Sequence, residues 1–496
     1  MLAGSLFGGA VIGVGGPQVG LLFTGALGAL FLLFLPAQLC LWLLFIVALL
    51  IVGLLDFFAY FQRAFWVPFL MGMVLMVKVP LELLRVGNQN VRYARQIPMF
   101  LIALYLFFAL FLFSGVLNET SALSMLVASK NYLFAWSIMF LIGLGAVSER
   151  SLENLWRFFL WVGVLQFPFA AIQRVFFASG RFGGLNWDVV VGTFGGNPDG
   201  GGASGAMALY LVFAMLLASS LYSAKRISGV FHWTVLACAL GTIALAEVKV
   251  VFLILPIGYM LLFRKQIPHN LGRTLLAGTL LLMALAGVFH IYRTTMYGDD
   301  LTAKHSVSRL EDLFSGESNI DYYNPRTREV SRIGALVRWR AFNPLSEPVP
   351  FLFGHGPGEA HESRTIGIGK LVRNYPFSLS TSTASRLLWE LGLIGYATFA
   401  LVLLAGALSA ERAARNDSIP EAHQLILRAN GAVLLLLASM TIYNLDAIES
   451  APIQFLIAAM IGHLLFLARK YSAGFNSIVS GAPAGVGTRK TSVAVS

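Results

Sequence analysis

The sequence predicts an all-α polytopic membrane protein, and three observations support this prediction. Of the 496 residues, 57% are hydrophobic and only 12% are charged, and the mean hydropathy is +0.75. Soluble domains carry about 25% charged residues, so this chain lacks the charge to cover a soluble surface of its size. The apolar residues also form long runs, which must become helices because lipid offers no partners to open backbone groups.

The apolar runs predict about 12 to 14 transmembrane helices, because a span needs about 20 mostly apolar residues. The candidate runs are 19–36, 38–58, 64–80, 98–117, 133–147, 155–172, 203–223, 228–246, 249–263, 273–291, 384–409, 429–443 and 451–468. Together they divide the chain into an N-terminal transmembrane bundle (1–291), a large loop with amphipathic helices (292–383), C-terminal transmembrane helices (384–471) and a disordered tail (472–496).

Basic residues predict the orientation of these helices. One set of alternate loops and the tail carry seventeen Lys and Arg residues, whereas the opposite short loops carry five. By the positive-inside rule the first set and the tail are cytoplasmic, so the 292–383 loop faces outward. The net charge of +11 is therefore better explained by cytoplasmic loops than by nucleic-acid binding. Cys40 and Cys238 lie apart in apolar runs, so neither a disulfide nor a metal site is expected.

An arginine-rich segment of the outer loop, 326–342, is the first candidate for chemistry. Val330, Ile333, Val337 and Ala341 recur at helical spacing and form an apolar stripe; Arg328, Arg332 and Trp339 fall opposite, and Arg338 lies on the flank. This pattern fits two structures equally well. One is an amphipathic helix on the membrane surface. The other is an arginine face that binds a diphosphate through bidentate guanidinium contacts.

A glycine-rich turn in the same loop, Gly354-His355-Gly356-Pro357-Gly358, is the second candidate. His355, Glu359 and His361 are the nearest groups able to accept a proton from a sugar hydroxyl, and we favour His355 among them. A structural turn with solvated histidines is an equal alternative. The histidine spacing is not typical of a metal site, so no metal is expected.

Other polar residues lie at the outer ends of predicted spans. A second glycine-rich loop, 191–205, contains Asn197 and leads into a span whose N-terminus can meet a phosphate, although a plain connection is the commoner meaning of such a loop. Arg386 and Glu390 are four residues apart, which predicts an intrahelical ion pair. The ionisable residues gather near interfaces, and no chain of them crosses the bilayer, which argues against a proton-driven pump.

The order of these motifs resembles the O-antigen ligase/polymerase superfamily of bacterial membrane glycosyltransferases. The residues that carry the resemblance are Gln166 and Arg181, Gly192-Thr193-Phe194, Asn197-Pro198, Lys249 at the start of a span, Arg338-Trp339, the turn 354–358 and the segment 388–395. The resemblance implies a C-type membrane glycosyltransferase fold in the bacterial inner membrane. It also implies metal-independent transfer of a glycan from a polyprenyl-diphosphate carrier to a hydroxyl of another glycan at the periplasmic face.

The resemblance also assigns roles and partners. Lys249 stands where the ligases show a Ser-Arg pair, and Arg338 matches the loop arginine that holds diphosphate. The ligases' His-Asn pair is replaced here by Ser380-Thr381-Ser382, which favours a polymerase of surface polysaccharide repeat units over a ligase that uses lipid A–core. A flippase for lipid-linked oligosaccharides is a second alternative. The expected diphosphate or glycan contacts are Arg181, Asn197, Lys249, Arg328, Arg332, Arg338 and Arg386. The expected partners are the lipid-linked donor, the glycan acceptor, membrane lipids and a chain-length regulator or envelope-assembly protein; no cofactor and no nucleic acid are expected.

Overall fold

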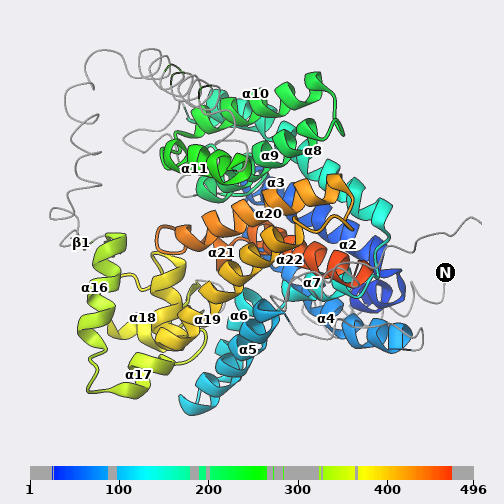
Figure 1. The fold of residues 1–496 in the computed structure, drawn as a ribbon. Coiled ribbons are helices and arrows are strands. Elements are labelled where there is room, and N and C mark those ends of the chain that lie inside the picture. The colour runs from blue at the N-terminus through cyan, green and yellow to red at the C-terminus, as the bar shows by residue number, and fades with distance from the viewer. Residues whose placement is uncertain are drawn as a thin grey trace, which may run out of the picture.

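The computed structural model describes residues 27–87, 98–178, 189–196, 202–264, 323–325, 328–363 and 367–471, with a few isolated positions outside these ranges. The described part is almost entirely helical, with two very short hairpins (Figure 1). This confirms the predicted all-α polytopic class. The first part of the predicted span 19–36, almost all of 273–291 and the tail 472–496 lie outside the described residues.

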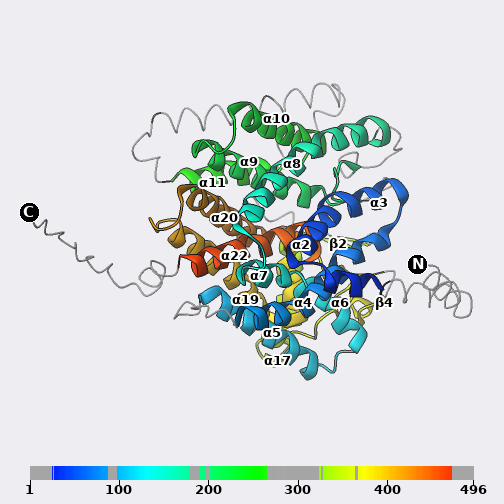
Figure 2. The same ribbon diagram turned by 90° about the vertical axis from the view of Figure 1, so that its right-hand side faces the viewer.

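The N-terminal part of the chain forms a bundle of helices that run roughly side by side (Figure 2). Its helices are α2 (Ala37–Ile46), the π-helix η1 (Val47–Ile51), α3 (Val52–Ala59), the short η2 (Gln62–Phe65), α4 (Trp66–Gly87), α5 (Met99–Leu117), α6 (Ala122–Tyr132), α7 (Trp136–Gly143), α8 (Glu149–Gln173), the π-helix η3 (Arg174–Ala178), α9 (Ser204–Ser223), α10 (Gly229–Ala246) and α11 (Val251–Phe263). The C-terminal helices are α19 (Thr383–Ala413), α20 (Glu421–Met440), the short α21 (Asp446–Glu449) and α22 (Ala451–Lys470).

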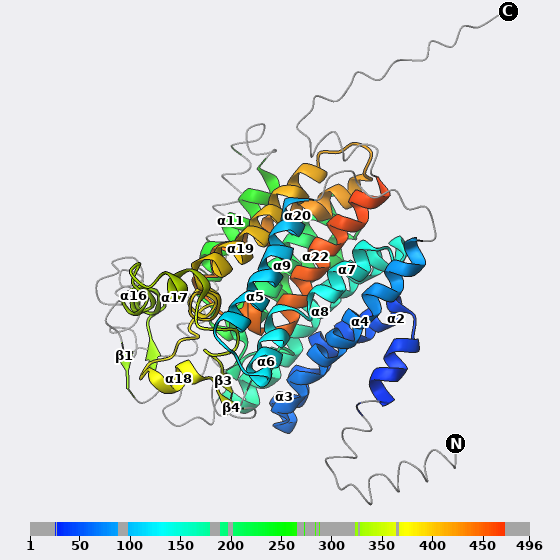
Figure 3. The ribbon, with the colours of Figure 1, turned by 90° about the horizontal axis from the view of Figure 1, so that it is seen from below.

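Nine of the described helical segments are long and apolar enough to cross a membrane. The pair α6 and α7, bent by 51° at a short break, makes a tenth if it is one span, and α11, at 13 residues, is shorter than a span needs. Each predicted span within 38–263 and 384–468 overlaps a helix, but the predicted span 133–147 covers only α7 of the bent pair, and 249–263 falls on the short α11. Helices α9 and α22 pass through the centre of the bundle (Figure 3) and are buried on nearly every side, whereas α10 lies at its edge (Figure 2).

The described part of the outer loop consists of short elements packed beside α19. They are the hairpin β1 (Tyr323–Asn324) and β2 (Glu329–Val330), α16 (Arg332–Phe342), α17 (Pro348–Phe353), the hairpin β3 (Glu362–Ser363) and β4 (Gly367–Ile368), and α18 (Lys370–Asn374). Both hairpins are antiparallel. The sequence interpretation of α16 is wrong in one respect, because Trp339, which it placed opposite the apolar stripe, is buried against α19. Ile333 and Val337 of the stripe are exposed.

Helix α19 is broken at Gly392, where φ is 71° and ψ is −170°. This conformation is accessible essentially to glycine alone. The break leaves the carbonyls of residues 388–390 without the partners that a continuous helix would supply. The outer loop supplies replacements: Trp339 Nε1 donates to the Leu388 oxygen over 3.0 Å, His355 N to the Trp389 oxygen over 3.0 Å, and Gly356 N to the Glu390 oxygen over 3.0 Å. The loop is therefore fixed on the broken helix by main-chain bonds.

We predict that Gly392→Ala detaches α17 from α19. A Cβ at Gly392 would lie 2.3 Å from the carbonyl carbon of Leu352, and the strained backbone alone costs about 1–3 kcal/mol. The melting temperature of the purified protein should fall, and limited proteolysis should cut within 343–360. Gly406→Ala in the same helix is the matched control, because its Cβ would meet no atom closer than 3.4 Å. Equal melting temperatures for the two variants would show that the break is not required.

Candidate functional site

A buried ion pair, Arg386 with Glu390, lies in the outer half of α19, just before the break. Arg386 Nε lies 3.2 Å from Glu390 Oε1, as the spacing in the sequence predicts, and both side chains are almost fully buried. The second Glu390 oxygen accepts a hydrogen bond from the Tyr132 hydroxyl over 2.7 Å and from Gly358 N over 2.8 Å. One carboxylate therefore ties α19 to α6 and to the glycine-rich turn.

Arg386 extends this pair toward the outer surface. Its Nη2 lies 3.2 Å from His361 Nδ1, and its Nη1 lies 3.7 Å from Glu449 Oε1 on α21. The Glu449 side chain is 46% exposed, so the group of charges is open to solvent on that side. The backbone explains how α21 reaches α19: Thr383 N donates to the Asn444 oxygen at the start of α19.

Lys130, near the end of α6, is the second cation of this group. Its ammonium lies 4.9 Å from the centre of the Trp66 ring and 4.9 Å from that of Phe69. It is close enough to Arg386 and Glu449 for their charges to act on it, yet no carboxylate among the described residues lies within ion-pair distance of it. We call the set Lys130, His361, Arg386, Glu390 and Glu449 the outer charge cluster. Lys130 is the cation in it whose charge no close carboxylate balances.

His361 is in the cluster but is a poor proton acceptor. Burial lowers its pKa to about 3, and the positive charges of Arg386 and Lys130 act in the same direction. The imidazole is therefore neutral at physiological pH. Because Arg386 donates to Nδ1, the lone pair of the ring is already used and the proton sits on Nε2, which has no hydrogen-bond partner.

His355 and Glu359 are held by contacts that position the loop. The His355 Nε2 lies 2.8 Å from Asn343 Oδ1, while the Asn343 amide nitrogen donates to the Trp339 carbonyl, so His355 donates through Nε2 and keeps the Nδ1 lone pair. Burial lowers the pKa of His355. Glu359 accepts a hydrogen bond from Lys370 N over 2.8 Å and thus caps α18. Of the three predicted catalytic residues, only His361 lies in the cluster. His355 keeps the Nδ1 lone pair, and Glu359 Oε1 has no hydrogen-bond partner among the described residues, so both residues can still accept a proton.

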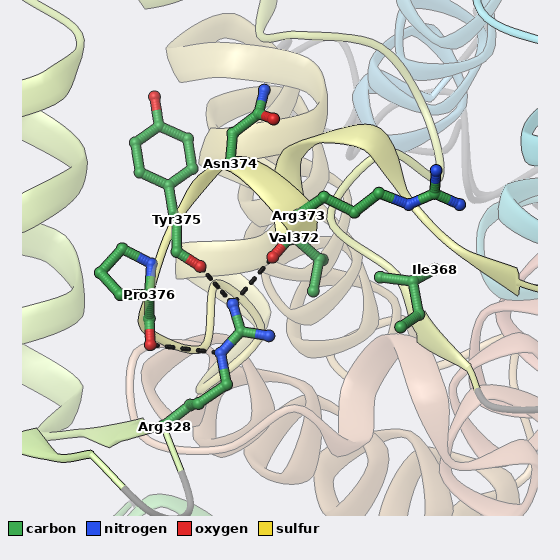
Figure 4. Close-up of a pocket in the computed structure, with 7 residues that line it drawn as sticks. All are labelled: Arg328, Ile368, Val372, Arg373, Asn374, Tyr375 and Pro376. Carbon is green, nitrogen blue, oxygen red and sulfur yellow. Dashed lines mark hydrogen bonds between the residues drawn. The ribbon is translucent and has the colours of Figure 1, made fainter.

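The arginines of the outer loop contact protein groups rather than one another. Arg328, with a left-handed φ of 60°, directs its guanidinium to the carbonyls of Val372, Tyr375 and Pro376, where it lines a hollow of about 420 Å³ (Figure 4). Figure 4 also shows the Arg373 side chain pointing away from Arg328, so the two guanidinium groups do not point toward one common site in the hollow. Arg328 therefore holds the main chain at the end of α18, and its assignment to the diphosphate site stays a prediction.

The remaining predicted contacts are also dispersed. Arg332 lies 4.0 Å over the Tyr443 ring beside α21, whereas Arg338 lies 5.5 Å over the Phe377 ring and has a buried Nη1 without a hydrogen-bond partner. Lys249 is exposed in the turn before α11, without a close ion pair among the described residues. Arg328 and Arg338 therefore both contact the 375–377 segment, whereas Arg332 lies beside α21, and the expected contact of these arginines with a diphosphate stays a prediction. Arg181 and Asn197 lie outside the described residues.

Two glutamines of α8 hold the second glycine-rich loop. Gln173 Oε1 accepts hydrogen bonds from Val191 N and Gly192 N. Gln166 pairs with Thr193, whose hydroxyl donates to the Leu49 carbonyl in the π-helix η1. The sequence motif of Gln166 with residues 192–194 is therefore one structural unit, and its described part anchors the loop in the bundle.

Asp446 on α21 is a residue of this region that the sequence did not assign to the site. Burial raises its pKa to about 7, and the nearby Glu449 charge adds to this, while Arg332 opposes it. Asn444 Nδ2 donates to Asp446 Oδ2 over 2.8 Å, and a Cβ at Gly205 would lie 3.2 Å from the same oxygen, so Asp446 faces the first turn of α9. The signal in the sequence is the pair of acidic residues, 446 and 449, between two apolar runs.

Comparison of the chain with protein-family models and with curated proteins finds no match. The resemblance to the O-antigen ligase/polymerase superfamily therefore stays a prediction.

We predict that Asp446→Asn changes how stability depends on pH. The folded protein holds a proton on Asp446 up to a pKa of about 7, whereas the unfolded chain releases it at the usual 3.8. Stability from this group is therefore present at low pH and is lost as the pH rises from the lower value to the higher. The amide does not titrate, so the variant should lose less stability than the wild type over this range.

Melting temperatures measured from roughly pH 4 to 8 bracket both pKa values and check this prediction. Asp417→Asn, an exposed carboxylate in the loop between α19 and α20, is the matched control and should keep the wild-type slope. A slope for Asp446→Asn equal to that of the control contradicts the assignment.

Proposed function

We propose that this chain is a bacterial inner-membrane glycosyltransferase that polymerises the repeat units of a surface polysaccharide. The observation that carries the proposal is the unbalanced cation Lys130, which lies near Arg386, whose partner Glu390 accepts a hydrogen bond from the glycine-rich turn. A charge that is costly to hold near lipid and lacks a protein partner fits an anionic group of the substrate. A lipid-linked diphosphate at the periplasmic face has this charge and this location.

The proposed reaction is transfer of a glycan from a polyprenyl-diphosphate carrier. The bond between the anomeric carbon and the diphosphate oxygen breaks, and a new bond forms from that carbon to a hydroxyl oxygen of a second lipid-linked glycan. The leaving diphosphate gains negative charge in the transition state, and Lys130 and Arg386 would stabilise it electrostatically. The hydrophobic tail of the carrier stays in the bilayer, and the outer loop covers the sugars.

The proton of the acceptor hydroxyl needs a destination. His355 Nδ1 keeps its lone pair, which supports the sequence preference for this residue. Asp446 is the second candidate, because a carboxyl whose pKa is about 7 is matched to proton transfer near neutral pH. His361 is disfavoured, since its lone pair is bonded to Arg386 and its pKa is about 3. We assign His361 the role of positioning the Arg386 guanidinium.

The proposal is tested with the purified chain in nanodiscs and polyprenyl-diphosphate-linked repeat units as the only substrate. A polymerase makes a ladder of longer glycans on a gel. A ligase makes product only when lipid A–core is added, and a flippase makes no new glycosidic bond but moves the labelled lipid across proteoliposomes. Either of the last two outcomes contradicts the proposal. Chain-length regulators or envelope-assembly proteins are the partners expected to alter the ladder.

We predict that Lys130→Gln slows chain growth roughly ten- to a hundred-fold, because a charge-assisted contact is worth about 1.5–3 kcal/mol. The fold should be unaffected, since no close ion pair among the described residues is lost. Lys130→Arg should retain much of the rate, because the charge is kept. Lys370→Gln removes the same charge from an exposed position on α18 and is the matched control. Wild-type chain growth by Lys130→Gln would remove Lys130 from the site.

A further inference from the structure

The helices α16 and α17 expose a row of apolar side chains. Ile333 is 45% exposed and Val337 48%, and they are four residues apart on α16, so they share one face. Leu345, in the connection to α17, is 64% exposed, and Val349 on α17 is 42% exposed. We call these four residues the apolar ridge. Exposed apolar side chains gathered in an otherwise polar loop indicate a surface that contacts either the membrane or another protein.

The position of α17 indicates that this surface contacts the membrane. The Phe353 ring at the end of α17 lies 5.0 Å from the Phe113 ring of α5, and Ser114 Oγ donates to the Phe353 carbonyl. These contacts place α17 at the level of the last turns of α5, a predicted membrane-spanning helix. At that level Leu112 and Val116 of α5 are 57% and 79% exposed, as expected for side chains that face lipid.

The arrangement of the elements agrees with this level. Figure 3 shows α16 and α17 on the flank of the bundle, near α19 and α5, while α18, β3 and β4 lie further toward the end of the bundle where α3 and α6 lie, the predicted outer end. A helix pair on the flank meets the bilayer rather than open solvent. The basic side chains are also placed for an interface: Arg340 is exposed one turn beyond Val337, and its guanidinium lies over the Phe351 ring of α17.

We propose that α16 and α17 form an interfacial helix pair whose apolar ridge lies among the acyl chains of the outer leaflet, with Arg340 at the level of the lipid phosphates. Phe353 of α17 contacts α5, whose exposed side chains face lipid, and Arg340 complements the anionic headgroups. This inference does not depend on the proposed enzymatic function. It has a consequence for the site, because Trp339 and α17 hold the glycine-rich turn on the break in α19. Contact of α16 and α17 with the bilayer thus fixes how far the glycine-rich turn lies from the membrane surface.

The test uses an environment-sensitive fluorophore on a single cysteine. Val337→Cys and, separately, Leu345→Cys are made in a chain with Cys40→Ala and Cys238→Ala, labelled with nitrobenzoxadiazole and placed in nanodiscs that contain one copy. Arg373→Cys on the exposed side of α18 is the matched control. Melting temperatures confirm that each labelled variant is folded.

The proposal predicts blue-shifted emission at 337 and 345, strong quenching by lipids brominated on the acyl chain, and little quenching by aqueous iodide. The control at 373 should show the reverse. Iodide quenching at 337 and 345 as strong as at 373 overturns the proposal. Shielding that occurs only in nanodiscs with two copies also overturns it, since the occupant of the ridge is then a second copy of the chain.

Discussion

The break in α19 at Gly392 is the constraint on which the outer half of the molecule depends. A helix interrupted inside a membrane bundle leaves carbonyls that lipid cannot bond, and each costs several kcal/mol if it stays unsatisfied. Here the indole of Trp339 and the amides of His355 and Gly356 bond these carbonyls. The loop can approach closely because glycine stands on both sides of the contact, at Gly354 and Gly392. The break in α19 therefore determines where the loop segment 339–356, distant in the sequence, packs.

The same arrangement determines the electrostatics of the outer charge cluster. The turn that covers the break donates Gly358 N to the Glu390 carboxylate, which also holds Arg386 and Tyr132. Buried charges near a bilayer are stable only when they are paired and hydrogen-bonded. Arg386 meets this condition, whereas Lys130 is left with two aromatic rings. An incompletely balanced positive site beside the broken helix is the physical basis of the proposed diphosphate recognition.

The sequence predicted the helices well because each apolar run must satisfy its backbone within one segment, and it predicted the Arg386–Glu390 pair because helical spacing is local. It did not predict side-chain positions that depend on contacts between distant segments. The pattern of α16 did not reveal that Trp339 is buried, because its indole is held by the carbonyl of Leu388, which is free only because α19 breaks at Gly392. Nor did it reveal that Lys130 approaches Arg386 from α6. The broken helix itself had only the weak signal of a glycine inside an apolar run.

The measurement that tests the central claim most directly is hydrogen exchange of the backbone amides in 351–360, resolved by mass spectrometry of the purified chain in nanodiscs. If the carbonyls of the broken helix and the Glu390 carboxylate hold the loop, the amides of His355, Gly356 and Gly358 exchange as slowly as those of the neighbouring spans. Exchange of this segment at the rate of an unprotected loop would contradict the account, because the turn would then not be bonded to α19.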